Sequence, residues 1–250
     1  DCTYLCVYFN LSFKIKQYLC TIIMRKIMNQ NLLNPYPLEY MPPWHLQGDA
    51  FILNYWLTPS FIQQSTHFRQ TPSPIGRLIQ VLLVRYQHSP VGPYDELLIL
   101  DHPLISKWRL SSIPKIFVST EISVQHGQQL WGIPKELATF EWQEQGQDTH
   151  CTIHFAQQCM HIHLRKPKKQ CSFYINSHYL PAAVLKIRQA WQGKRYQFSP
   201  QFRGHLSKLV SVQWENTQDI FPNFSEAKYV QSFYAPHFEL IFPEARIQQK

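Results

Sequence analysis

Lys135 is the residue with the clearest potential for chemistry, because it lies in the largely apolar run LWGIPKELATF, residues 130–140. A lysine amine attacks carbonyl carbons only when it has lost its proton, and burial favours that neutral form because a charge is costly away from water. A neutral lysine can form a Schiff base with a ketone or aldehyde. The alternative interpretation of the same run is a lysine whose stem covers the core while its ammonium reaches water.

A second candidate is the turn VGPYDEL, residues 91–97, which brings a tyrosine and two carboxylates to the start of a predicted strand. Successive strand residues face opposite sides, so only one of Asp95 and Glu96 can point inward. The inward carboxylate could act as a general acid or position a substrate. The alternative is an exposed turn in which the aspartate caps the backbone, and the residues alone leave the choice open.

The elements that must position these side chains are predicted to be mostly strands. A content of 18 prolines against 8 glycines, with 14% aromatic residues, favours short extended segments broken by turns. The hydrophobic pattern predicts strands over several ranges, namely 50–57, 78–86, 97–100 and 135–142. The β-branched run 113–124 is predicted to be extended and to lead into a short helical turn at 126–130; residues 182–191 favour a helix, with a strand as the alternative.

The length and the 44% hydrophobic content fit one sizeable core, so a single domain is predicted over residues 28–250. Residues 1–27 differ from the rest, since they hold three of the six cysteines and two lysines that interrupt their apolar stretch. They match neither a secretory signal nor a membrane span. We expect them to be a non-native or disordered extension, with translation beginning at Met24 or Met28.

Several other classes of site lack support in the sequence. The remaining cysteines show no CxxC spacing, which argues against a disulfide framework and favours a reduced, cytoplasmic protein. The histidines at 150, 154, 161 and 163 have no third ligand at a strong spacing, so no metal is expected. The basic run RKPKKQ, residues 165–170, is typical of an exposed hairpin turn. No nucleic acid and no membrane partner are expected, and Ser119 and Ser123 lack a nucleophile-elbow pattern.

Four segments together resemble the acetoacetate decarboxylase family. They are GPYDE, then HGQQLWGIPKELATFEW some forty residues later, with PPWHLQGDAFILNY before them and FELIFPEARI near the end, so the resemblance covers residues 40–248. It implies a mainly β, strongly twisted antiparallel sheet that closes into a barrel-like cone, with a few short helices and an apolar cavity inside. Lys135 then matches the Schiff-base lysine, and Glu96 matches a glutamate that transfers a proton or orients the substrate. Tyr94, Trp131 and Ile133 are expected to bind the substrate.

The chain departs from the family pattern at three places. Glu136 stands where the family has a second lysine, Gly48 stands where it has an arginine, and the triplet glycine-arginine-glutamate reads Gly127, Gln128, Gln129. A carboxylate beside Lys135 would favour its charged form, but on a strand Glu136 would point to the other face. Without the family's arginine, a substrate carboxylate needs another partner, and Arg85, Arg109 or a histidine are the candidates.

The resemblance implies a lyase that decarboxylates a β-keto acid or a related oxo compound through an iminium on Lys135. No cofactor is expected, because the protonated imine itself accepts the electrons of the broken bond. One alternative keeps the Schiff base but catalyses aldol condensation, dehydration or cyclisation of an oxo acid. Another is a non-catalytic module that binds small molecules in the same fold. The expected partners are a small oxo acid and further copies of the chain in a homo-oligomer.

Overall fold

The computed structural model describes residues 38–65, 76–101, 110–168, 171–180, 185–216 and 220–249. Residues Tyr40–Lys250 form one compact unit. The extension predicted at residues 1–27 lies outside the described residues, and the domain boundary placed after it therefore stays a prediction.

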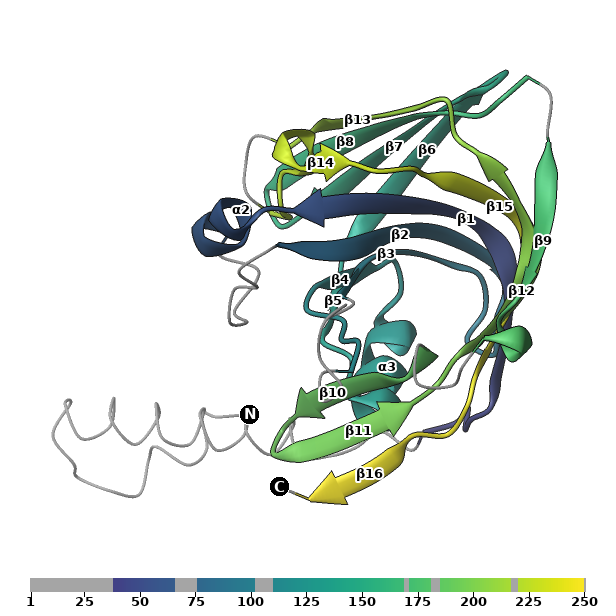
Figure 1. Ribbon diagram of the computed structural model, residues 1–250. Coiled ribbons are helices and arrows are strands. Elements are labelled where there is room, and N and C mark those ends of the chain that lie inside the picture. Colours follow the sequence, from purple (N-terminus) through teal and green to yellow (C-terminus); the bar gives the residue numbers. More distant parts are fainter. Residues whose placement is uncertain are drawn as a thin grey trace, which may run out of the picture. The chain divides into compact units, whose positions relative to one another are not determined.

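Strands dominate the described chain and form three sheets (Figure 1). The largest sheet has nine strands, and its main path runs in the order β5 (Lys135–Leu137), β4 (Ile116–Val118), β3 (Tyr94–Asp101), β2 (Arg77–His88), β1 (Trp44–Leu57), β15 (Phe233–Phe242), β12 (Gln201–Lys208) and β9 (Ser172–Asn176). The ninth strand, β14 (Lys228–Tyr229), pairs with β1.

Two smaller sheets complete the unit. One has the order β13 (Ser211–Glu215), β8 (Gln158–Arg165), β7 (Asp148–Phe155) and β6 (Thr139–Gln145), and the other has the order β10 (Ile187–Trp191), β11 (Lys194–Phe198) and β16 (Arg246–Gln249). The helical elements of the described residues are α2 (Pro59–Gln64), α3 (Glu121–Trp131) and two short turns, η1 (Ser177–Tyr179) and η2 (Phe224–Glu226). The prediction of a mainly β protein with few short helices is confirmed.

The strands β1, β2 and β3 are buried on both faces. One face packs against the four-stranded sheet, and alternate residues such as Leu53, Val81 and Ile99 meet Ile153 and Ile162 there. The other face curves around α3, as Figure 1 shows. Burial on both sides explains why the segment LLIL in β3 is continuously apolar instead of alternating. The second face is the one that carries the candidate site.

The predicted closure into a barrel is wrong, because none of the sheets formed by the described residues closes on itself. The path of the large sheet begins at β5 and ends at β9, and these two strands do not pair. β5 has three residues and joins β4 in parallel. After Ala138 the chain starts β6 in the four-stranded sheet, so β5 is too short to continue the large sheet towards closure.

Two predicted elements are also corrected. The run 113–124 is not one extended segment, because β4 ends at Val118 and α3 begins at Glu121. Within α3 the buried residues Val124, Gly127 and Trp131 recur at helical spacing, and their packing prevails over the β-branched composition. The favoured helix at 182–191 is a strand over Ile187–Trp191, where pairing with β11 decides the conformation. Residues 182–184 lie outside the described chain, and Leu185, the first described residue of the range, is helical.

Candidate active site

Lys135 and Glu96 form a buried ion pair on the face of the large sheet that curves around α3. The Lys135 Nζ lies 2.9 Å from Glu96 Oε2, and both side chains are 6% exposed. Glu96 comes from β3 and Lys135 from β5, with β4 between them in the sheet. Strand pairing therefore brings together two residues that are 39 positions apart in the sequence.

Helix α3 holds the lysine from the other side. Ser123 Oγ lies 3.0 Å from Lys135 Nζ and is itself fully buried. One turn further along, Gly127 leaves the space through which the lysine stem passes: a Cβ at this position would lie 2.5 Å from Lys135 Cδ. Gln128 donates a hydrogen bond to the Lys135 carbonyl at 2.9 Å. The helix thus fixes both the backbone and the side chain of Lys135.

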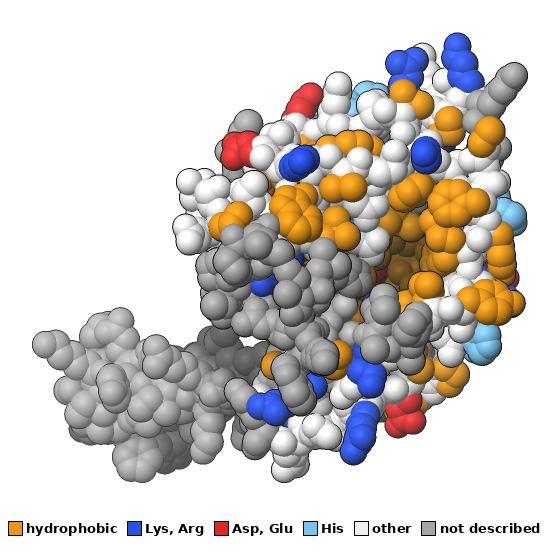
Figure 2. Space-filling model, viewed as in Figure 1, with side chains coloured by type: hydrophobic (Ala, Val, Ile, Leu, Met, Phe, Trp, Pro, Cys, Tyr) orange, Lys and Arg blue, Asp and Glu red, His pale blue; other side chains and the backbone are white. Residues whose placement is uncertain are grey.

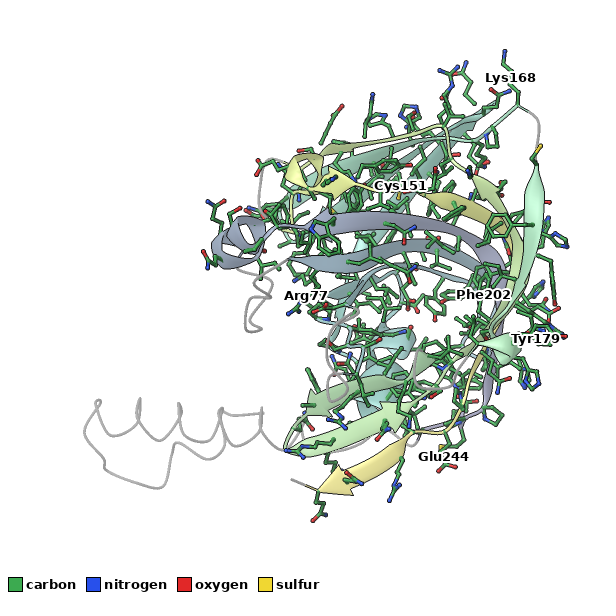
Figure 3. The ribbon with its side chains drawn as sticks, viewed as in Figure 1. Arg77, Cys151, Lys168, Tyr179, Phe202 and Glu244 are labelled. Carbon is green, nitrogen blue, oxygen red and sulfur yellow. The ribbon has the colours of Figure 1, made fainter. Side chains whose placement is uncertain are left out.

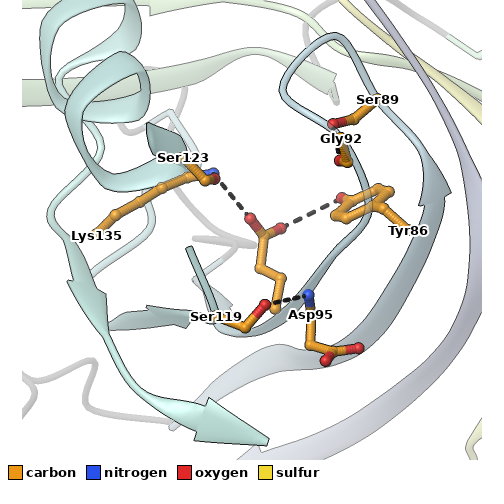
Figure 4. A network of polar contacts seen from close by, with 8 residues as sticks. Tyr86, Ser89, Gly92, Asp95, Ser119, Ser123 and Lys135 are labelled. Carbon is orange, nitrogen blue, oxygen red and sulfur yellow. Dashed lines mark hydrogen bonds and ion pairs between the residues drawn. The ribbon is translucent and has the colours of Figure 1, made fainter. Parts of the chain in front are cut away.

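Two tyrosines complete the polar network, and Figure 4 shows one of them, Tyr86, directed at the carboxylate that Lys135 also contacts. Tyr86 OH donates a hydrogen bond of 3.3 Å to Glu96 Oε1, and the Tyr94 ring lies 5.1 Å from Lys135 Nζ. Burial, followed by the nearby Glu96 carboxylate, raises the pKa of both phenols well above the usual value, although a hydrogen bond with Ser123 partly opposes this for Tyr94. Both hydroxyls therefore stay protonated and can donate hydrogen bonds.

A small cavity of about 20 Å³ lies beside the pair. That volume holds roughly one water molecule. Apart from Glu96 and Lys135 its walls are apolar or aromatic, from Trp44, Leu46, Tyr86, Tyr94, Leu98, Ile113, Ile116, Trp131, Ile133 and Phe242. Figure 2 shows a hollow lined by hydrophobic side chains in the region where Figure 1 shows the concave side of the large sheet.

The structure places the three predicted substrate-binding residues, Tyr94, Trp131 and Ile133, in the wall of this cavity. Trp131 is fixed by a hydrogen bond of 2.7 Å from its indole nitrogen to the Pro243 carbonyl, and its ring meets Trp44 edge to face at 5.0 Å. That these three residues bind a substrate stays a prediction.

Sequence reasoning missed several residues of the site. Trp44 and Leu46 alternate with exposed residues at the start of β1, a period-two signal that could have placed them on one face. Ser123 and Gly127 are four positions apart, so they would share a helix face, but that signal requires the helix to be predicted first. Tyr86 offers no comparable signal.

The carboxylates next in sequence to the two site residues point elsewhere. Glu136 pairs with Lys115 at 2.7 Å, as expected for a residue that follows Lys135 on a strand. Asp95 faces the four-stranded sheet, where burial raises the pKa of its carboxyl while the nearby Trp142 indole N–H and the Arg85 charge oppose the shift. Of the two carboxylates that the sequence left open, Glu96 is therefore the one that points inward.

The position where the resembled family has an arginine offers no room for a side chain. Gly48 lies in β1 between β2 and β15, and a Cβ there would come within 2.1 Å of the Arg85 carbonyl oxygen. Arg85 itself points away from the cavity and pairs with Glu144 at 2.6 Å. Arg109 lies outside the described residues. Among the described residues that line the cavity, Lys135 is the only cation.

The other sequence features fall outside this site. The four histidines lie on β7 and β8, where the rings of His150 and His163 meet at 4.3 Å, and the described residues contain no group of three or more ligands that could hold a metal ion. Within the described residues, no disulfide joins Cys151, Cys159 or Cys171. Ser119 accepts a hydrogen bond from the Asp95 backbone. In the part of the chain that is described, no helix is long and apolar enough to cross a membrane.

Comparison with known proteins gives a likeness at the level of structure only. No protein-family model and no curated protein matches the chain. Acetoacetate decarboxylase from Legionella pneumophila superposes with a TM-score of 0.59 at 13% sequence identity, covering 86% of this chain and 89% of that chain. An acetoacetate decarboxylase-like enzyme from Sphingomonas wittichii RW1 gives a TM-score of 0.61 at 10% identity, covering 87% and 97%.

A third similar structure is the enduracididine biosynthesis enzyme MppR, complexed with the condensation product of pyruvate and imidazole 4-carboxaldehyde. It gives a TM-score of 0.57 at 12% identity, covering 85% of this chain and 91% of that chain. The chain therefore has the acetoacetate decarboxylase fold, which these proteins share.

Proposed function

We propose that the protein is a Schiff-base lyase that acts on an oxo compound, with Lys135 as the nucleophile and Glu96 as the group that moves protons. The observation that carries this proposal is the buried contact of 2.9 Å between Lys135 Nζ and Glu96 Oε2 beside an apolar cavity. Paired ionisable groups beside a mostly apolar cavity are typical of catalytic sites. The shared fold with acetoacetate decarboxylase supports the reaction class.

In the proposed reaction Glu96 takes a proton from the Lys135 ammonium, and the freed amine attacks the substrate carbonyl. Loss of water leaves an iminium on Nζ. In a β-keto acid the bond to the carboxylate then breaks, carbon dioxide leaves, and the bonding electrons move to the iminium nitrogen to form an enamine. The proton that Glu96 took has by then left with the water, so Glu96 relays a proton from solvent to the enamine carbon, and water hydrolyses the new iminium to release the ketone and the Lys135 ammonium. The nitrogen itself is the electron sink, so no cofactor takes part.

The neighbouring hydroxyls have positioning roles in this proposal. Ser123 holds Nζ at 3.0 Å, and Tyr86 holds the second oxygen of Glu96 at 3.3 Å, so the carboxylate keeps one oxygen directed at the amine. Such fixed donors reduce the reorganisation that each proton transfer requires.

One observation favours a second reaction at the same lysine. Among the described cavity residues Lys135 is the only cation. Its amine becomes part of the Schiff base, so it cannot also bind a substrate carboxylate. Such a carboxylate would then have no separate charged partner among these residues. A substrate without that carboxylate could still form the iminium and undergo aldol condensation or dehydration. Condensation as a reaction type has separate support, because the ligand in the MppR complex of the same fold is the condensation product of pyruvate, itself an acid, and imidazole 4-carboxaldehyde.

The proposal is tested by borohydride trapping, which reduces an iminium to a stable secondary amine. The wild type is incubated with β-keto acids, α-keto acids and aldehydes, each with borohydride, and its peptides are analysed by mass spectrometry. We expect an adduct on the peptide containing Lys135 and none in Lys135→Ala. Lys228→Ala, which removes an exposed lysine on β14, is the matched control and should be modified like the wild type.

Product analysis then separates the reactions. Release of carbon dioxide from a β-keto acid would establish the decarboxylase, whereas a trapped adduct with a condensed or dehydrated product would establish the second reaction. If every compound leaves Lys135 unmodified while some of them raise the melting temperature, the lyase is excluded and the protein is a small-molecule-binding module.

A further inference from the structure

Three arginines without an ionic partner gather on one small sheet. The described residues include seven arginines, and four of them pair with a carboxylate, in the pairs Arg77–Asp101, Arg85–Glu144, Arg165–Asp148 and Arg203–Glu239. The other three are Arg188, Arg195 and Arg246, which lie on β10, β11 and β16. All three are exposed, and within the described chain none of them forms an ion pair.

Strand register places the three arginines on the same face. Arg188 lies opposite Gln197, which lies opposite Arg246, so these three residues form one row across the sheet. Arg195 is two residues from Gln197 on β11 and therefore faces the same side. Neighbouring strands are about 4.8 Å apart, which sets Arg188 and Arg246 roughly 10 Å apart with Arg195 on the strand between them. We call this side of the sheet the arginine face.

The opposite face of this sheet is anchored to the rest of the unit. Tyr196 and Phe198 are buried, and Tyr196 packs so closely on Gly132, just after α3, that a Cβ there would lie 2.3 Å from its ring. Gln189 donates a hydrogen bond of 3.0 Å to the Ile113 carbonyl. The backbone under the arginine face is therefore held in place before a ligand binds. The conformational entropy that the protein loses on binding is then confined to the side chains of this face.

The charge around the arginine face is one-sided. The sequences of the three strands, IRQAW, KRYQF and RIQQ, contain no acidic residue. The nearest acid along the chain is Glu244, which Figure 3 shows just before β16. Lys194 begins β11 and alternates with Arg195, so it faces the opposite side of the sheet. Figure 2 shows several blue side chains, with a red one beside them, over the region where Figure 1 shows these strands.

We propose that the arginine face binds the phosphodiester backbone of a nucleic acid. A guanidinium donates paired hydrogen bonds to a phosphate, and contacts of this kind fix a protein on a nucleic acid without reading its sequence. The remaining residues of the face are Gln197, Gln248 and Ala190, so it offers hydrogen-bonding amides but no large apolar side chain that a protein interface core or a bilayer would bury. The net charge of the chain is +8, of which residues 1–27 contribute +3 and residues 28–250 contribute +5, and an excess of positive charge favours a polyanion.

This inference does not depend on the reaction at Lys135, and it differs from the sequence-based expectation that no nucleic acid binds. In the sequence, the only concentrated basic signal is the single run at residues 165–170, which is typical of a turn. The three arginines are scattered along the chain, and only the pairing of β10, β11 and β16 makes them neighbours.

The test measures binding of the full chain to a short labelled DNA duplex of mixed sequence by fluorescence anisotropy over a series of salt concentrations. The target variant is Arg188→Gln/Arg195→Gln/Arg246→Gln. The matched control is Arg85→Gln/Arg165→Gln/Arg203→Gln, which removes the same charge from arginines that already have partners. Circular dichroism and gel filtration verify that both variants are folded.

We expect the target variant to bind at least about tenfold more weakly and to lower the slope of log K against log salt by roughly two to three, since each phosphate contact contributes about 0.9. The control variant should stay within about twofold of the wild type. Equal losses in both variants would show a mere effect of net charge and overturn the proposal. The proposal is also overturned if the wild type does not bind the duplex. Polyglutamate and vesicles containing phosphatidylserine serve as two other anionic ligands. If the target variant binds either of these more weakly than the wild type does, but binds DNA equally well, the arginine face is not a nucleic-acid site.

Discussion

At the scale of single residues, the buried pair of Lys135 and Glu96 places a proposed nucleophile beside a proton acceptor, but burying the two charges costs folding free energy. Two charges are held away from water, and each is tolerated only because the other and the hydroxyls of Ser123 and Tyr86 replace the lost hydration. A buried pair of this kind adds little net stability, but a single buried charge left behind is strongly unfavourable.

We therefore expect Lys135→Met to reduce the free energy of unfolding by about 3–5 kcal/mol, because it leaves the Glu96 carboxylate buried without its partner. The double variant Lys135→Met/Glu96→Gln should recover most of that loss, since both charges are gone and the introduced amide can still accept the hydrogen bond from Tyr86. Urea denaturation of the two variants and the wild type measures the difference. Equal stabilities of the single and double variants would contradict the pairing seen in the structure.

At the scale of elements, helix α3 positions the side chain of Lys135. Gly127 is a helical residue with no side chain, and helices normally disfavour glycine by about 1 kcal/mol relative to alanine. Its presence is explained by the lysine stem, whose Cδ and Cε would lie 2.5 and 2.7 Å from a Cβ at this position. The stem is flexible, so a methyl group there displaces Lys135 instead of disrupting the backbone.

The expected result for Gly127→Ala is a protein that melts within a few degrees of the wild type, because the gain in helix propensity offsets part of the crowding. Borohydride trapping at Lys135, however, should fall by at least about tenfold, because a displacement of roughly 1 Å is enough to lose catalytic alignment. Gln129→Ala on the same helix is the control and should trap like the wild type. Unchanged trapping in Gly127→Ala would show that the passage for the stem is not required.

At the scale of the whole described unit, the large sheet separates two environments. One face forms the hydrophobic core with the four-stranded sheet, and the other buries the polar network around Glu96 together with Tyr86 and Tyr94. Because the sheet does not close, α3 and the apolar walls, not a ring of strands, exclude water from Lys135. The buried phenols then make the stability of the unit sensitive to alkaline pH.

Burial raises the pKa of Tyr86 and Tyr94 well above 10 and that of Tyr234 to about 12. The stabilisation is complete below the pKa of the unfolded chain, near 10. Above it the unfolded state releases protons that the folded state keeps, so the free energy of unfolding should fall by up to about 1.4 kcal/mol per pH unit for each such tyrosine. Urea denaturation at several pH values from roughly 9 to 11 measures this slope.

The double variant Tyr86→Phe/Tyr94→Phe separates this effect from the titration of lysines, because it removes two of the phenols and leaves the lysines unchanged. Its stability should decline less steeply with pH than that of the wild type. Parallel slopes in the two proteins would exclude a contribution from the buried phenols.

The sequence by itself determined the strand-rich class, the lysine at the centre of the site and the turn that carries its carboxylate partner. Local composition is enough to predict strands such as β1 and β2, because alternation and β-branched runs are properties of neighbouring residues. The apolar run around Lys135 and the turn before Glu96 are visible for the same reason, and the resemblance to acetoacetate decarboxylase connects them. The structural likeness confirms the mainly β, acetoacetate decarboxylase-like fold that this resemblance implies, but not the closure into a barrel.

Only the tertiary structure decided the rest, because it depends on which segments meet. The helix α3 forms against the β-branched composition of its first turn, since burial of its inner face outweighs local propensity. The inward choice of Glu96 over Asp95, the support from Ser123 and the passage at Gly127 all follow from that packing. The open edge of the large sheet and the arginine face arise in the same way, from strand pairing between segments that are distant in the sequence.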